Sequence, residues 1–275
     1  MLNGGKRVEE RTVKKVPQKT DFEKAEKWNV RLNVCRIAIA LISLITIVMA
    51  HLELEILFVN ETVIVILLCL NFINIYGKCR FSSLYRRAEE TRRKGFLDNA
   101  FGTKMVDIES EGYYDTEDIK LGFKRFLANL HENCFYSSRI SEKMFAASEK
   151  KLVIGSIIVL VISISNFCKM QVVVAVIDLL IAADVLEEYR SLKTFSEETN
   201  KILDECIDIW NSYSERYSNP DNKTMARIMK AYSHYEATLA YESIMLDGKI
   251  FNNINEQLKK EWEGLKKRYG MKEEE

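Results

Sequence analysis

Four apolar stretches restrict most strongly what this chain can fold into. They cover residues 37–52, 62–77, 152–168 and 170–186, and only the last contains formal charges, Asp178 and Asp184. Each stretch would form a helix about 24–26 Å long. This is a little shorter than the roughly 30 Å of a typical membrane-spanning helix of about 20 residues. Flanking lysines and arginines that reach toward the interface would extend each stretch. The alternative is four core helices of a soluble bundle, but such helices show a polar face and these stretches are apolar all round.

The spacing of the stretches pairs them into two membrane hairpins. Lysine and arginine number ten in residues 1–36, fifteen in 78–151 and fourteen in 186–275, with one in the two hairpin tips together. The positive-inside rule then places both termini and the central segment in the cytoplasm.

The predicted fold is an all-α membrane protein with four transmembrane helices and a helical cytoplasmic domain. Its segments are residues 1–36 (cytoplasmic), 37–77 (first hairpin), 78–151 (cytoplasmic helical insert), 152–187 (second hairpin) and 188–275 (cytoplasmic helices).

Composition narrows the function classes. Glycine (11) and proline (2) are scarce, as in mostly helical proteins. A formal net charge of zero argues against a globally basic protein that binds DNA or RNA polymers. Six scattered cysteines without a C-x-x-C pair, and three histidines, make a poor metal-ligand set. No common nucleotide-fold, hydrolase or metalloprotease motif occurs. We therefore expect no enzyme activity, no metal and no bound cofactor.

Small and polar residues recur on one face of each predicted span. The candidates for a helix interface or a pore lining are Asn71, Asn74, Ser156, Ser163, Asn166 and Asp178. Such faces usually mark helix–helix contacts, and a water-filled path in an oligomer is the sharper alternative. Asp178 is the best candidate for that path, because a carboxylate within a membrane normally faces an interior or a cavity. The other interpretation of Asp178 is a protonated acid bonded to a neighbouring helix.

The cytoplasmic segments are expected to be helical. The second span should continue as a helix until Gly95, followed by a compact loop to Gly102. Thr116 resembles the N-cap of a following helix. After a break at Asn219-Pro220, a second helical stretch is expected from about Lys223 to Tyr269.

The central segment has the residue types of a site for an anionic ligand. Arg86, Arg87, Arg92, Arg93 and Lys94 place five cations within nine residues. Arginine binds phosphate in a bidentate manner, and nearby aromatic rings could stack on bases. The candidate ligand-binding residues are Arg92, Arg93, Phe96, Asp98, Asn99, Tyr113 and Tyr114. The alternative is a basic helix that contacts anionic lipid, since the cluster directly follows a span.

Three segments carry a family resemblance: RRKGFLDNAFG (residues 92–102), GYYD (112–115) and ENCFYSSRI (132–140), with YESIMLDGKIFNNINEQLKKEW (241–262) also similar. Together with the two flanking hairpins, the chain resembles the SMODS-associating four-transmembrane effector family of cyclic-oligonucleotide-based anti-phage signalling (CBASS). The resemblance covers about residues 20–270. It implies an effector in the bacterial inner membrane, encoded beside a nucleotidyltransferase that makes a cyclic oligonucleotide.

The resemblance and the residues together define an expected mechanism. A cyclic di- or trinucleotide would bind the central segment, drive homo-oligomerisation and open a leak through the membrane, causing abortive infection. A ligand can shift such an equilibrium only through its different affinities for the two states. The two alternatives are a constitutive or otherwise gated ion channel and a non-conducting membrane scaffold.

Overall fold

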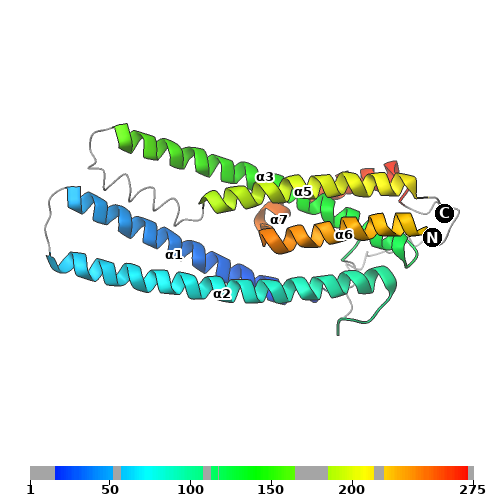
Figure 1. Cartoon of the computed structure of the whole chain (residues 1–275), viewed down its shortest axis with the longest axis horizontal. Helices are drawn as coiled ribbons and strands as arrows, with labels where there is room; N and C mark the ends of the chain where they lie inside the picture. Colours follow the sequence, from blue (N-terminus) through cyan, green and yellow to red (C-terminus); the bar gives the residue numbers. More distant parts are fainter. Residues whose placement is uncertain are drawn as a thin grey trace, which may run out of the picture.

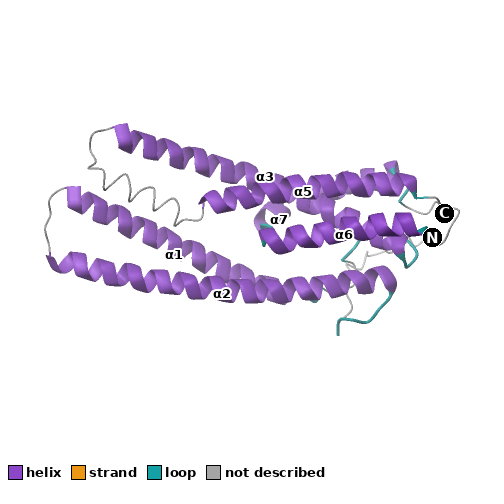
Figure 2. Cartoon of the chain, in the orientation of Figure 1, coloured by secondary structure: helices purple, strands orange, loops and turns teal. Residues whose placement is uncertain are grey.

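The structure is a computed structural model. It describes residues 16–51, 57–107, 113–116, 118–164, 185–213 and 220–271. Those residues contain six helices and no strand (Figure 2). The helices are α1 (Lys19–His51), α2 (Leu57–Phe101), α3 (Phe123–Ile164), α5 (Val185–Ser212), α6 (Asn222–Glu242) and α7 (Gly248–Arg268). The prediction of an all-α fold is confirmed for this part of the chain.

Two antiparallel helix pairs run along the molecule, and α6 and α7 pack at one end of it (Figure 1). In the first pair, Cys35 Sγ of α1 lies 3.4 Å from the carbonyl oxygen of Leu70 in α2. Near the start of α1, Phe22 meets Tyr85 of α2 edge to face. In the second pair, Lys151 of α3 forms a 3.1 Å ion pair with Glu188 of α5. Side-chain contacts thus hold the two helices of each pair together along their shared length.

The hydrophobic core lies at the end where α6 and α7 pack, and we call this part the bundle. Its core consists of large rings and aliphatic side chains from α2, α3, α5, α6 and α7. The most fully buried among them include Phe96, Phe126, Phe195, Ile228 and Trp262. The acidic N-caps Asp221 and Asp247 accept backbone N–H bonds at the first turns of α6 and α7. These caps and the apolar faces together fix α6 and α7 against the longer helices.

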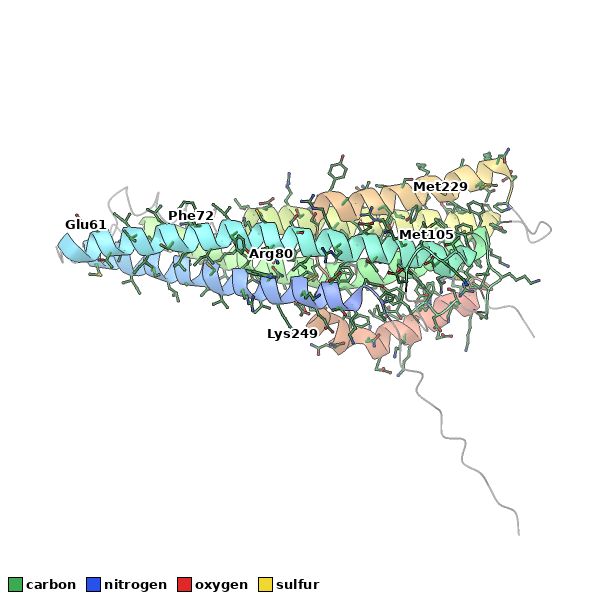
Figure 3. The ribbon with its side chains drawn as sticks, turned by 90° about the horizontal axis from the view of Figure 1, so that it is seen from below. Glu61, Phe72, Arg80, Met105, Met229 and Lys249 are labelled. Carbon is green, nitrogen blue, oxygen red and sulfur yellow. The ribbon has the colours of Figure 1, made fainter. Side chains whose placement is uncertain are left out.

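The opposite end of the molecule exposes apolar side chains, and we call it the apolar end. Exposed residues there include Val34, Ile37 and Leu41 in α1, Leu68, Phe72 and Ile75 in α2, and Ile154, Ile157 and Leu160 in α3. Figure 3 shows Phe72 on the part of α2 beyond the bundle, with Arg80 nearer to the bundle. The part of the chain that the structure describes has one helix long and apolar enough to cross a membrane, Glu61–Phe101, and only 6% of its apolar window is buried.

Several predicted boundaries were wrong. Helix α2 continues through Gly95 to Phe101, and Gly102, with a φ of +67°, follows its end. Helix α3 begins at Phe123 after the turn that contains Gly122 (φ +132°), so Thr116 is not its N-cap. Ser243, with a φ of +47°, ends α6, so the helical stretch expected from about Lys223 to Tyr269 consists of two helices, α6 and α7. The fourth predicted span lies outside the described residues.

Candidate functional site

The structure places the seven predicted ligand-binding residues near the end of α2, where six are buried or half-buried and Arg93 is exposed. Five of them lie near the end of α2, between Arg92 and Asn99. Tyr113 and Tyr114 follow in the next described segment, and the Tyr114 ring lies 5.9 Å from that of Phe96. The grouping expected from the sequence is therefore present in space, but its residues mostly contact one another and the core.

Arg92 is the centre of an ion-pair cluster that joins α2 to α6. Its Nε donates to Glu89 at 2.8 Å, and its Nη2 donates to both carboxylate oxygens of Glu236 at 2.7 and 2.8 Å. The guanidinium also lies 5.8 Å from the ring centre of Tyr235. Only 8% of the Arg92 side chain is exposed. Both carboxylates therefore already compensate this buried charge.

The pKa values in this cluster follow from burial and from the neighbouring charges. Burial alone would lower the pKa of Arg92, but the charges of Glu89 and Glu236 outweigh it and hold that pKa above its ordinary value. Burial raises the pKa of Glu236, and the charge of Arg92 opposes that rise. Each buried charge in the cluster thus has a close partner of opposite charge.

Arg93 is the accessible cation of the cluster. Its Nε lies 3.1 Å from the second oxygen of Glu236, and 45% of its side chain is exposed. Glu236 thus holds a buried and an exposed arginine together. A negatively charged group arriving from solvent would meet Arg93 first.

Phe96 is part of the core rather than a free stacking surface. It is 1% exposed. Its ring stacks on Tyr232 at 5.2 Å and meets the edge of Phe126 at 4.8 Å. Aromatic partners already cover the ring, so a base would have to displace one of them to stack there.

Asp98 and Asn99 organise the chain around the end of α2. Asp98 accepts hydrogen bonds from the hydroxyl of Thr103 and from the backbone N–H groups of Met105 and Val106. Asn99 accepts from Arg125 Nε at 3.2 Å and from the side-chain amide of Asn129 at 2.8 Å. The Asp98 bonds hold the turn against the end of α2, and the Asn99 bonds tie that end of α2 to α3.

Tyr113 and Tyr114 pack against each other edge to face at 4.7 Å. The hydroxyl of Tyr114 accepts a 3.3 Å hydrogen bond from Asn133. Burial raises the pKa of both phenols, so both stay protonated at neutral pH.

Sequence reasoning missed the acidic half of the cluster. Glu236 is 144 residues from Arg92, and no local pattern connects them. One signal was available: Tyr85, Ala88, Phe96 and Ala100 are buried at helical spacing on α2, and Arg92 shares that face. A charged residue on a buried face requires a partner of opposite charge.

The predicted pore or interface residues are only partly described. Asn71 and Ser156 are exposed, and each donates to the backbone carbonyl four residues earlier in its own helix. Asn74 is half-buried, and its Oδ1 has no hydrogen-bond partner in the described part of the chain. The side chain of Ser163, and Asn166 and Asp178, lie outside the description. No group of three or more potential metal ligands occurs among the described residues.

Comparison with known proteins adds no relative. No family model, curated protein or solved structure matches the chain.

Proposed function

We propose that the chain is a multi-pass protein of the bacterial inner membrane whose cytoplasmic bundle controls the membrane segments. The observation that carries this proposal is the separation of the molecule into two ends. One end has a packed core with a buried ion-pair cluster, and the other exposes long apolar side chains on three helices. Each such side chain gains about 1.5–3 kcal/mol on leaving water, and lipid provides that gain without a protein partner.

Continuous helices connect the two ends. Helix α2 runs for 45 residues from the apolar end into the bundle, and α3 runs for 42 residues from the bundle back to the apolar end. Arg92 and Glu236 fasten the bundle part of α2 to α6. A rearrangement at that contact would therefore be transmitted along α2 to the apolar end. The proposed topology has four spans in two hairpins with both termini cytoplasmic, following the distribution of lysine and arginine.

The activating ligand in this proposal is a cyclic di- or trinucleotide. The resemblance to the four-transmembrane effector family supports it, as does the exposed guanidinium of Arg93 beside the shared carboxylate of Glu236. A ligand phosphate competing for these arginines would favour a state in which α2 and α6 are held differently. The effector would then oligomerise and permeabilise the membrane through a path that Asp178 helps to line.

Two cysteines on α2 test the membrane assignment. Cys69 and Cys79 are both exposed, and as helix residues ten positions apart they are separated by about 15 Å. In inside-out membrane vesicles, we expect a membrane-impermeant maleimide to label Cys79 readily and Cys69 about tenfold more slowly or not at all, because a thiolate does not form in hydrocarbon. Peptide mapping by mass spectrometry measures the two sites in one sample.

Detergent and orientation supply the controls. Solubilisation in detergent should give the reagent more access to Cys69, and right-side-out vesicles should protect Cys79. Equal labelling of the two cysteines in intact inside-out vesicles would contradict the span and favour a soluble bundle. Recovery of the chain in the soluble fraction of the cell would lead to the same conclusion.

A further inference from the structure

An open pocket lies at the far end of the bundle, away from the apolar end. Its volume is about 240 Å³, and its lining residues are Lys124, Trp210, Asn211, Tyr213 and Tyr269. Lys124 belongs to the first turn of α3, Trp210 and Asn211 to the last turn of α5, and Tyr269 directly follows α7. Three helix ends therefore meet around one small cavity.

The aromatic walls of the pocket are held in place by internal hydrogen bonds. The indole Nε1 of Trp210 donates to the carbonyl oxygen of Tyr269 at 2.8 Å. The backbone N–H of Tyr213 donates to the carbonyl oxygen of Trp210 at 3.1 Å. Trp210 is 7% exposed. These contacts fix the Trp210 indole and the backbone at Tyr213 and Tyr269 before a ligand arrives, which lowers the entropy lost on binding.

The charges around the pocket favour an anion. Lys124 Nζ lies 5.7 Å from the ring centre of Trp210, and the guanidinium of Arg268 lies 5.7 Å from the ring of Tyr269. No acidic side chain is among the described residues that line the cavity. An aromatic cage for a quaternary ammonium would not place a lysine in its wall, because the two cations would repel each other.

We propose that this pocket binds a nucleobase and its adjoining phosphate, with Tyr213 and Tyr269 contacting the base and Lys124 contacting the phosphate. Planar rings that carry negative charge suit a pocket of aromatic walls and one cation. Pockets that hold drug-sized ligands have volumes of about 300–1,000 Å³. This cavity is smaller than that range, so it suits a smaller group such as one base with its phosphate. That the nucleotide is a cyclic oligonucleotide rests on the proposed function. The rest of such a ligand would extend into solvent.

A direct packing route leads from the pocket into the core. The ring of His131, seven residues after Lys124 on α3, lies 6.1 Å from that of Tyr269 and 5.3 Å from that of Trp262. Both nitrogens of His131 and the indole nitrogen of Trp262 are buried without a hydrogen-bond partner in the described residues. A ligand that shifts Tyr269 would repack these rings against α3. Since α3 continues to the apolar end, the pocket is placed to affect the membrane segments.

Binding to the full chain in detergent micelles tests the pocket. The probes are AMP, GMP and a panel of cyclic di- and trinucleotides, titrated by calorimetry. For any probe that binds, Lys124→Gln should weaken the affinity about tenfold through loss of a charge-assisted contact. Tyr213→Ala should weaken it by a similar factor through loss of stacking. Lys143→Gln, at an exposed position on the same helix, is the matched control and should bind as the unmodified chain does.

The results of these titrations distinguish failure of the proposed pocket from failure of the proposed function. Binding that Lys124→Gln and Tyr213→Ala leave unchanged, or no binding of any probe, overturns the pocket. Binding that Arg93→Gln abolishes while both pocket variants retain it also overturns the pocket and places the ligand at the Arg92 cluster. Cyclic di- or trinucleotides that bind through the pocket without causing any membrane leak would support the pocket and contradict the effector function, whereas binding of AMP or GMP alone tests only the pocket.

Discussion

Arg92→Ala is expected to destabilise the bundle by about 3–5 kcal/mol, because removing one partner of a buried ion pair leaves charge without compensation. The substitution leaves the carboxylates of Glu89 and Glu236 without the guanidinium that both contact. It also removes the strongest polar link between α2 and α6. Thermal unfolding of the full chain in detergent micelles, followed by tryptophan fluorescence, measures the loss.

Arg93→Ala is the matched control for this prediction. Arg93 pairs with the same carboxylate at 3.1 Å, but 45% of its side chain is exposed. Exposed ion pairs contribute about 0–1 kcal/mol, so this variant should unfold close to the unmodified chain. A similar stability change for both variants would show that burial of Arg92 does not determine the strength of the cluster.

The second large expected effect is a loss of stability in mild acid caused by His131. Burial lowers the pKa of its imidazole from 6.5 to about 4. Between these values the unfolded chain binds the proton more readily than the folded chain does. The contribution of His131 to the free energy of unfolding is therefore fully present above pH 6.5 and decreases by about 3 kcal/mol as the pH falls to about 4.

His131→Phe isolates this contribution. Phenylalanine retains the ring contacts to Trp262 and Tyr269 and cannot take up a proton. In the unmodified chain, proton uptake by His131 in the unfolded state lowers the free energy of unfolding as the pH falls from 6.5 to 5. The variant lacks this loss, so its free energy of unfolding relative to the unmodified chain should rise by about 2 kcal/mol between pH 7 and pH 5. If the stabilities of the two proteins depended equally on pH, that result would contradict a lowered pKa for His131. The carboxylates that titrate in this range are common to both proteins and cancel in the difference.

The sequence predicted those features that depend on local periodicity. The helical character of the chain follows from the apolar stretches and the scarcity of glycine and proline. The interaction between the end of α2 and the following tyrosines was expected from the clustering of arginine and aromatic residues. Phe126, Leu127 and Leu130 of α3 are spaced as on one face of a helix, and all three are buried.

The features that sequence reasoning missed depend on distant contacts and on backbone conformation. Gly95 lies within α2, while Gly102 adopts the left-handed conformation after its end. Either glycine could have ended the helix on propensity alone. The ion pair of Arg92 could not be predicted, because its partner Glu236 is 144 residues away on α6. The pocket could not be predicted, since its residues come from three helix ends that meet only in the folded chain.

The most direct measurement is leakage of ions and dye from liposomes that contain the purified chain, with each cyclic di- or trinucleotide added in turn. A no-ligand sample and protein-free liposomes are the controls. We expect that one messenger triggers leakage and that liposomes in the no-ligand sample stay tight. Leakage without ligand would contradict messenger gating and favour a constitutive channel. A tight membrane with every messenger, after correct insertion has been verified by labelling of Cys79, would contradict the effector function and favour a non-conducting scaffold.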